Sequence, residues 1–259
     1  RKIARTIEEG RLTPKVIITV DLFGLPANYP AIRKIADAHR LFILEDGAQG
    51  FGGMIGNKRA CSFGDISTTS FFPAKPLGCY GDGGAVFTDN DEWAALADSY
   101  RLHGKGMFKY DNVRIGMNSR LDTLQAAILK IKFKAFREYE LRDINKAAAL
   151  YTRLLAGRVK TPVTPEGYYS SWAQYTICLN SREERDALQA CLKEQGIPSM
   201  VYYPTPMHGQ TAYKALNAPT DCCPTAKRLC DTVLSLPVHP YITEEEIETV
   251  CSVILGFVR

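Results

Sequence analysis

The sequence predicts an α/β fold, with a mostly parallel sheet in the first part of the chain and a smaller α+β domain in the second. A strand–helix–strand succession predicts the first part, because apolar runs at 16–20 and 41–44 flank a helical pattern at 30–40. Such a βαβ unit joins parallel strands and places ligands at their carboxyl ends. A change after residue 155, from one long helical stretch to short strands and capped helices, predicts the second part.

The elements of the first part follow in order. The opening residues have a helical face without a preceding cap, so we expect the chain to begin inside a helix and an N-terminal segment to be missing. The apolar runs at 16–20 and 41–44 predict strands that are buried on both faces. Two further strands are expected around a glycine-rich connection, at 66–72 and 84–88.

A helical pattern from 120 to 155 is long enough to link two domains, and its apolar face is formed by Leu121, Leu124, Ile128 and Ile131. We place the domain boundary after residue 138, which gives a large domain at 1–138 and a small domain at 139–259.

Within the small domain, a strand is expected at 173–179. Capping boxes that begin at Ser181 and Thr243 predict two helices, and Gly196 should end the first of them. The last helix has an apolar face made of Ile247, Val250, Cys251 and Ile254.

Composition excludes several classes of protein. Of the 259 residues, 46% are hydrophobic and 23% are charged, which is far from the composition of a disordered chain. The net charge of +4 is too small and too evenly spread for a nucleic-acid-binding surface. No apolar run approaches the roughly 20 residues of a membrane helix, and the first ten residues lack the apolar core of a secretory signal. We therefore expect a cytoplasmic globular protein that binds no nucleic acid and no membrane.

The eight cysteines do not predict a metal site. They form no Cys-x-x-Cys pair, and no histidine lies within a ligand-like spacing of the one cluster, Cys222, Cys223 and Cys230. We expect most of them to be small apolar residues in a reducing compartment, and we expect no bound metal.

Three polar residues lie close to predicted strand ends. Asp46 and Gln49 follow the strand at 41–44, and Lys75 lies in a proline- and glycine-flanked loop after the next strand. Taken singly, Asp46 is typical of a turn or helix cap, and Lys75 is typical of a solvated surface charge. Together they suit pyridoxal phosphate (PLP), which needs a lysine amine for its Schiff base and a carboxylate against its ring nitrogen.

Eight short motifs occur in order along the chain. They are VDLFG at 20–24, EDGAQ at 45–49, GD at 64–65, SFFPAK at 70–75, GDGGA at 81–85, HG at 103–104, NSRLD at 118–122 and QAA at 125–127. This series resembles the DegT/DnrJ/EryC1/StrS aminotransferases, PLP enzymes that aminate keto sugars on nucleotide carriers. The resemblance implies the type I PLP aminotransferase fold. The phosphate-binding loop and stacking aromatic residue of that family have no equivalent in this sequence, so we expect the large domain to be N-terminally incomplete.

The resemblance implies roles for individual cofactor-binding residues. Lys75 would carry the Schiff base and move a proton between cofactor and substrate, and Asp46 would pair with the pyridine nitrogen. Gln49 would lie by the ring, and Ser70 would contact the phosphate. Asn118 would reach the phosphate in the site of a neighbouring subunit, which implies a homodimer with shared sites. The plainer alternatives are a loop amide for Gln49, a strand-end serine for Ser70 and a helix cap for Asn118.

Two further residues are candidates for substrate binding. Arg120 would hold an acidic group, because a guanidinium suits carboxylate or phosphate, although a surface ion pair is an equal alternative. His208 would border the sugar site, although a lone histidine is more often structural.

The resemblance implies transamination of a keto sugar on a nucleotide, with L-glutamate as amine donor. The sequence around Lys75 is closest to enzymes that act on UDP-linked 3-keto-N-acetylglucosaminuronate in surface polysaccharide biosynthesis. Two alternatives stay open. One is a PLP-dependent sugar dehydratase, against which Lys75 argues because those enzymes carry histidine there. The other is a non-catalytic PLP-binding regulatory protein.

Overall fold

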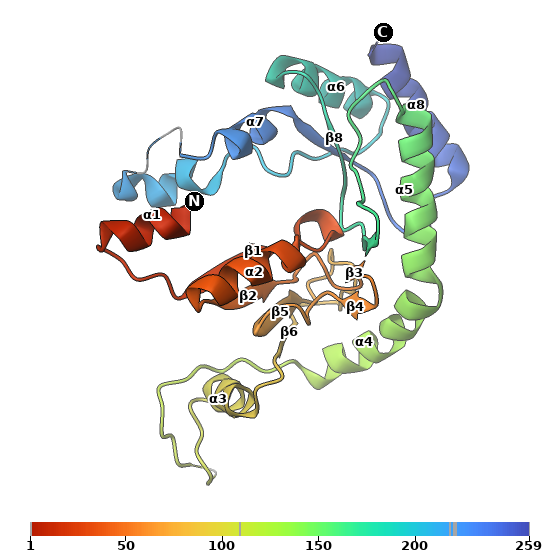
Figure 1. Ribbon diagram of the computed structural model, residues 1–259. Coiled ribbons are helices and arrows are strands. Elements are labelled where there is room, and N and C mark those ends of the chain that lie inside the picture. The colour runs from red at the N-terminus through yellow and green to blue at the C-terminus, as the bar shows by residue number, and fades with distance from the viewer. Residues whose placement is uncertain (1, 109, 218, 220–221, 259) are drawn as a thin grey trace. The chain divides into compact units, whose positions relative to one another are not determined.

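The computed structural model describes residues 2–108, 110–217, 219 and 222–258. The chain divides into two compact units (Figure 1). The first unit contains Arg1–Tyr139 and Thr164–Ala173, and the second contains Glu140–Val163 and Gln174–Arg259. The short segment Thr164–Ala173 was assigned to the small domain by the sequence analysis, and it belongs to the first unit here.

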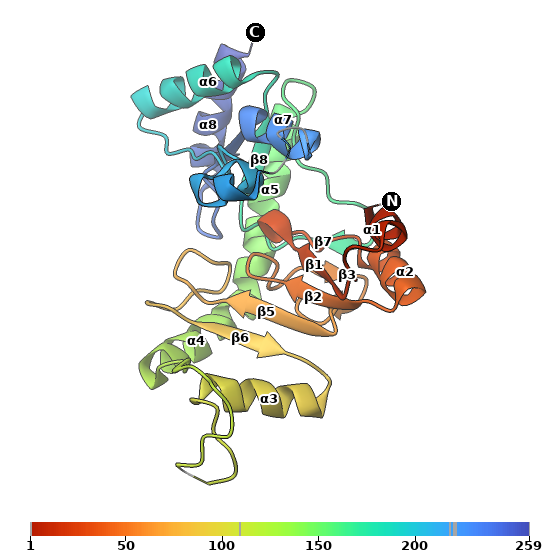
Figure 2. The ribbon, with the colours of Figure 1, turned by 90° about the vertical axis from the view of Figure 1, so that its left-hand side faces the viewer.

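A four-stranded sheet with the order β1-β2-β5-β6 forms the centre of the first unit (Figure 2). Its strands are β1 (Val16–Val20), β2 (Phe42–Asp46), β5 (Ile66–Ser70) and β6 (Gly84–Phe87). The pairs β1·β2 and β2·β5 are parallel, and β6 is antiparallel to β5. The predicted mostly parallel sheet is therefore confirmed, and the carboxyl ends of β1, β2 and β5 lie at one edge.

One face of this sheet is covered by helix α2 (Tyr29–His39). The shared core contains Tyr29, Ala36, Leu41 and Ile43, with Ile17 packed against it. Asn28 caps α2 by accepting a hydrogen bond from the Ala31 N–H, as expected for a helix that begins beside a proline. Helix α1 (Lys2–Glu9) precedes the sheet and has no buried residue.

The other face of the sheet is partly open in the described chain. Side chains alternate along a strand, and on β1 the residues of this face are all exposed, with Ile18 at 66%. Helix α3 (Asp91–Arg101) covers part of this face, where Trp93 packs edge-on against Phe42 with ring centroids 5.1 Å apart. The prediction of strands buried on both faces is wrong for this chain, because no described element packs over β1 on this side.

Three two-residue strands form a second sheet in the first unit, and the sequence analysis missed all of them. They are β3 (Met54–Ile55), β4 (Lys58–Arg59) and β7 (Tyr168–Tyr169), in the order β4-β3-β7. The segment that carries β7 also contacts Gly24, whose φ is +102°. A Cβ at Gly24 would lie 2.5 Å from the Trp172 nitrogen, so a larger residue would push this segment away.

The long helical stretch is confirmed as α4 (Thr123–Ala135), a π-helical turn (Phe136–Glu140) and α5 (Leu141–Leu155). Its predicted apolar face is not buried throughout, since Leu124 is 70% exposed and Ile131 is 76% exposed. Helix periodicity identifies an apolar face, but a partner element is needed to bury it.

The second unit is an α+β assembly around the antiparallel pair β8 (Tyr175–Cys178) and β9 (Val233–Leu236). Helix α5 packs against α8 (Glu244–Phe257), and α6 (Arg182–Glu194) packs against α7 (Pro224–Thr232), α8 and strand β9. The capping box of Thr243 and Glu246 is present, and the predicted apolar face of α8 is buried. Ser181 caps α6 as predicted, but Glu184 receives its hydrogen bond from the Asn180 N–H, so the predicted box is incomplete. None of the described helices is long and apolar enough to cross a membrane.

Candidate active site

The carboxyl edge of the sheet brings two predicted site residues to one face. Asp46 is the last residue of β2 and Ser70 is the last residue of β5. In the strand register, Asp46 lies opposite Thr68. Because residues two apart share a face, Asp46, Thr68 and Ser70 all point to the partly open face of the sheet.

The Asp46 carboxylate is half-buried and can accept further hydrogen bonds. Its Oδ1 accepts a hydrogen bond of 3.1 Å from the Ala48 N–H. None of the described residues donates to its Oδ2. A carboxylate held in this way can still accept a strong hydrogen bond from a protonated ring nitrogen.

Gln49 is tied to the loop that follows β1. Its Oε1 accepts a hydrogen bond of 2.7 Å from the Phe23 N–H, and its carbonyl accepts one of 3.0 Å from the Ser171 hydroxyl. Phe23 has a φ of +61°, an unusual value for a non-glycine residue. The structure therefore gives Gln49 a role in holding this loop and places it three residues after Asp46.

Lys75 lies in a tight loop between β5 and β6. The Lys75 N–H donates to the Phe72 carbonyl at 2.9 Å, and the Cys79 N–H donates to the Phe71 carbonyl at 2.7 Å. The loop is closed at Gly78, where a Cβ would lie 2.6 Å from the Pro73 carbonyl oxygen. The half-buried Lys75 side chain has no hydrogen bond or ion pair at its Nζ among the residues that the structure describes.

Ser70 is held at the start of the same loop. Its hydroxyl oxygen accepts a hydrogen bond of 3.2 Å from the Phe72 N–H, which leaves the hydroxyl proton available for another acceptor. The end of β5 and the Lys75 loop thus form one locally ordered segment.

Behind this edge, a buried carboxylate supports the strand ends from the opposite face. Glu45 is fully buried, and its two oxygens accept hydrogen bonds from the N–H groups of Cys61, Phe63 and Gly64 and from the Ser67 hydroxyl, at 2.5–2.9 Å. Adjacent residues on β2 therefore have different functions, because Glu45 holds the loop before β5 while Asp46 faces the open side.

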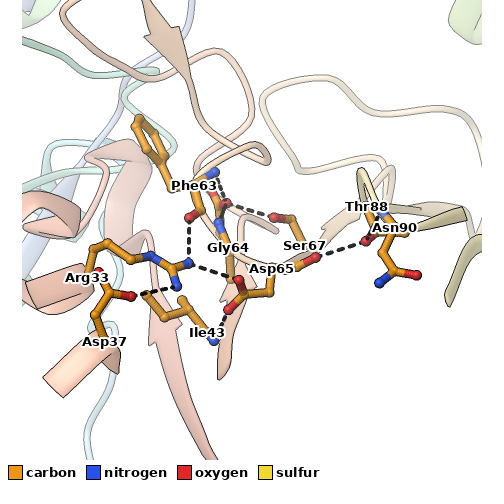
Figure 3. A network of polar contacts seen from close by, with 10 residues as sticks. Arg33, Asp37, Ile43, Phe63, Gly64, Asp65, Ser67, Thr88 and Asn90 are labelled. Atoms are coloured by element: carbon orange, nitrogen blue, oxygen red, sulfur yellow. Dashed lines mark hydrogen bonds and ion pairs between the residues drawn. The ribbon is translucent and has the colours of Figure 1, made fainter. Parts of the chain in front are cut away.

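The GD motif at 64–65 also helps to hold the strands of this sheet in place (Figure 3). The Asp65 carboxylate accepts a hydrogen bond of 2.6 Å from the Ile43 N–H and pairs with Arg33 of α2 at 3.3 Å. The Asp65 carbonyl accepts a hydrogen bond from Thr88 at 2.9 Å. This network ties α2, β2, β5 and the end of β6 together, so the motif has a structural role.

Asp21 is a second buried carboxyl group, directly after β1. Its Oδ1 accepts hydrogen bonds from the Tyr29 hydroxyl at 2.8 Å and the Ala27 N–H at 3.0 Å. Its Oδ2 is buried with no partner among the described residues and lies against Gly50, where a Cβ would come within 2.5 Å. Burial, and to a lesser extent the charge of Glu45, raises the pKa of Asp21 to about 7.

Two predicted residues lie elsewhere in the first unit. Asn118 is exposed, pairs with Leu102 in an isolated bridge and accepts a hydrogen bond of 3.0 Å from the Arg120 Nε. Asn118 and Arg120 both line a cavity of about 1100 Å³, together with residues of β5, β6 and α3. Lys75, Asp46, Gln49 and Ser70 do not line it.

His208 belongs to the second unit, in the short 3-10 helix Met207–Gly209. It lies near Cys222 and Cys223, and one ligand atom from each of the three residues lies within 4.8 Å of the others. No histidine is near these cysteines in the sequence, which is why no metal site was expected there. Chain folding nevertheless brings His208 to them.

The sequence matches the DegT/DnrJ/EryC1/StrS aminotransferase family over residues 1–255. The chain belongs to this family. It is 41% identical over 247 residues to the UDP-2-acetamido-2-deoxy-3-oxo-D-glucuronate aminotransferase of Pseudomonas aeruginosa. The matched region covers 94% of this chain and 67% of that protein. It is 42% identical over 249 residues to a pleiotropic regulatory protein of Geobacillus stearothermophilus, and the matched region covers 95% of this chain and 66% of that protein.

Among solved structures, a DegT/DnrJ/EryC1/StrS aminotransferase from Brucella abortus is 49% identical and superimposes with a TM-score of 0.93, covering 99% of this chain and 68% of that one. This match confirms the type I PLP aminotransferase fold. The chain spans about two thirds of the length of these relatives.

Proposed function

We propose that this protein is a PLP-dependent aminotransferase that acts on a keto sugar carried by a nucleotide. The observation that carries the proposal is the carboxyl edge of the sheet, where Asp46 and Ser70 share a face and the loop after β5 presents Lys75. Family membership supports this assignment, and so does the name of the Pseudomonas aeruginosa relative.

The side chains fit PLP in charge and in free hydrogen-bonding capacity. The Lys75 amine has no partner among the described residues, the Asp46 Oδ2 can accept from a protonated ring nitrogen, and the Ser70 hydroxyl can donate to a phosphate. When bound, PLP supplies an electron sink for the carbon that exchanges its amine. Lys75 then moves the proton at that carbon, and Asp46 keeps the ring nitrogen protonated. Gln49 holds the loop after β1 through its hydrogen bond from the Phe23 N–H, and its position three residues after Asp46 suits a residue that would lie by the ring.

For the substrate, we propose a UDP-linked 3-keto sugar acid used in surface polysaccharide synthesis, with L-glutamate as the amine donor. The name of the Pseudomonas aeruginosa relative describes such a compound. Arg120 is exposed, and its guanidinium can bind a carboxylate or phosphate of the substrate. His208 is the candidate on the sugar side.

We also propose a homodimer in which Asn118 of the partner subunit completes each cofactor site. The segment between α3 and α4 exposes several large apolar side chains, namely Met107, Phe108, Tyr110, Ile115 and Met117. Such a contiguous apolar segment is typical of a subunit interface. A reducing cytoplasm suits the eight cysteines, none of which forms a disulfide in the structure.

A regulatory protein without catalysis is the second candidate, because the Geobacillus stearothermophilus relative carries a regulatory name at 42% identity. The two candidates differ in chemistry, since a regulator can bind PLP without converting it. A lysine lost from this position would favour the regulator, so the presence of Lys75 favours the enzyme.

An absorption experiment on the full-length protein tests the proposal. The protein with PLP should show a visible band that L-glutamate bleaches, and borohydride reduction should fix the label to the peptide that contains Lys75. The variant Lys75→Ala should lose band and label, while Lys34→Ala, which changes an exposed lysine on α2, should keep both.

The outcomes separate the candidates. A labelled Lys75 with a band that neither glutamate nor another amino donor bleaches would favour the regulator. Labelling that survives in Lys75→Ala would overturn the assignment of the cofactor lysine.

A further inference from the structure

A histidine and two adjacent cysteines form a compact cluster in the second unit, apart from the candidate cofactor residues. His208 comes from the short helix Met207–Gly209, and Cys222 and Cys223 directly precede α7. The ligand atoms of the three side chains lie within 4.8 Å of one another. The two sulfur atoms are 3.8 Å apart.

We propose that His208, Cys222 and Cys223 bind a Zn²⁺ ion, with the fourth coordination position open. In a tetrahedral zinc site with Zn–S bonds of about 2.3 Å, two sulfur ligands are about 3.8 Å apart. The observed separation of the sulfur atoms equals this spacing. An imidazole nitrogen would lie about 3.6 Å from each sulfur, so the imidazole needs to approach by at most about 1.2 Å from the observed positions.

The donor set selects this metal. Two thiolates and one imidazole are soft or borderline ligands, which favour zinc over magnesium and calcium, whose sites are built from oxygen. Two thiolates also neutralise the charge of the ion. Cys223 is the N-cap residue of α7, and the unpaired N–H groups of a helix start favour negative charge at that position.

His208 lines a cavity of about 330 Å³ together with Lys227, Asp231 and the Arg182 side chain, whereas neither Cys222 nor Cys223 lines it. A fourth ligand could reach the ion from this cavity, on the His208 side. Three protein ligands and an accessible fourth position are the arrangement of zinc sites that bind water or a small molecule. The ion would also link the helix at Met207–Gly209 to the start of α7.

A consequence follows for the candidate substrate site. The imidazole of His208 cannot bind zinc and a sugar through the same nitrogen, so zinc should compete with substrate. This consequence rests on the proposed function, whereas the metal site does not.

Cobalt binding to the reduced full chain tests the site. Co²⁺ replaces Zn²⁺ in tetrahedral thiolate sites and then shows intense d–d bands in the red, where PLP does not absorb. We expect these bands to appear at one Co²⁺ per chain and to vanish when Zn²⁺ is added. Cys222→Ser and Cys223→Ser should each abolish them. His208→Ala should weaken binding by at least about tenfold, since even residues that only support metal ligands contribute about 10- to 100-fold.

Cys191→Ser is the matched control, because Cys191 is a half-buried cysteine on α6 of the same unit. It should leave the bands unchanged, and circular dichroism checks that each variant is folded. The proposal is overturned if folded, reduced wild-type protein gives only the weak spectrum of octahedral cobalt. It is also overturned if the bands persist in the Cys222→Ser and Cys223→Ser variants. Neither result bears on the labelling of Lys75, so failure of the metal site and failure of the proposed function are distinguishable.

Discussion

Asp21 is a buried carboxyl group whose two oxygens have unequal surroundings. Oδ1 accepts two hydrogen bonds, and Oδ2 has no partner among the described residues. A neutral, protonated carboxyl group is the form that burial favours here, which is why its pKa is raised to about 7. In the unfolded chain the same group loses its proton near pH 4. Folding therefore takes up a proton between these two values.

This difference predicts how stability depends on pH. The folded state binds the extra proton, so its free energy of unfolding should fall as pH rises from about 4 to about 7, by up to about 1.4 kcal/mol per pH unit. Asp21→Asn stays neutral and keeps the Oδ1 acceptor, so its stability should fall less steeply over this range. Urea unfolding followed by tryptophan fluorescence measures the effect in the first unit, which contains both tryptophans, Trp93 and Trp172.

Asp89→Asn is the control, because Asp89 is exposed and its replacement should leave the slope unchanged. Parallel stability curves for the wild type and Asp21→Asn between pH 4 and pH 7 would contradict the raised pKa.

At the residue scale, the sequence indicated where the candidate cofactor-binding residues lie, but it did not indicate which residues hold the neighbouring loops in place. Asp46 and Ser70 could be placed because both end strands of one parallel sheet, and parallel strands end at a common edge. Glu45 and Asp21 could not be assigned roles, because their partners come from loops whose path depends on the whole fold. His208 illustrates the same limit, since spacing along the sequence does not report proximity to Cys222 and Cys223.

At the element scale, the beginning of β5 is fixed to β2 by the backbone and the side chain of one residue. The Asp65 N–H donates to the Ile43 carbonyl at 2.9 Å, and the Asp65 carboxylate accepts from the Ile43 N–H at 2.6 Å. Together these bonds extend the pairing of the two strands by one residue. Ile43 is fully buried, so its N–H would have no water to replace the carboxylate.

Asp65→Ala should therefore lower the free energy of unfolding by about 1–3 kcal/mol, the cost of a buried donor without an acceptor. Asp65→Asn keeps an oxygen for the Ile43 N–H and loses only the charge that pairs with Arg33. Because that ion pair is partly exposed, this variant should lose no more than about 1 kcal/mol. Arg33→Gln removes the same pair together with the contacts of Arg33 to Asp37 and to the Phe63 carbonyl, so it should lose at least as much as Asp65→Asn. Urea unfolding of the three variants measures the difference, and equal losses in Asp65→Ala and Asp65→Asn would contradict the role of the Ile43 hydrogen bond.

The strands and helices were predictable where a local pattern determines them. The β-branched run of β1 and the capping box of α8 are such patterns, and both elements were found as expected. The burial of both faces of β1 was not predictable in the same way, as the exposed Ile18 shows, because burial depends on which other element packs there. The two-residue strands β3, β4 and β7 are too short to give a periodic signal.

At the scale of the whole molecule, the segment between α3 and α4 exposes more apolar surface than a monomer is expected to keep. Ile115 is 97% exposed and Met107 is 91% exposed, and Asn118 follows in the same segment. Burying this segment against a second copy would remove apolar area from water and would bring Asn118 to the partner. Both consequences belong to one event, so oligomeric state and cofactor affinity should change together.

Ile115→Glu should therefore weaken the proposed dimer by at least about tenfold, because an unpaired carboxylate in an apolar interface costs several kcal/mol. Sedimentation velocity should show a shift toward monomer, and titration with PLP should show weaker binding under the same conditions. Val163→Glu places the same charge on an apolar side chain of the second unit that is 76% exposed, and it should change neither measurement. A dimer that withstands Ile115→Glu would place the interface elsewhere. A monomer that binds PLP as tightly as the wild type would show that Asn118 of the partner subunit is not needed at the cofactor.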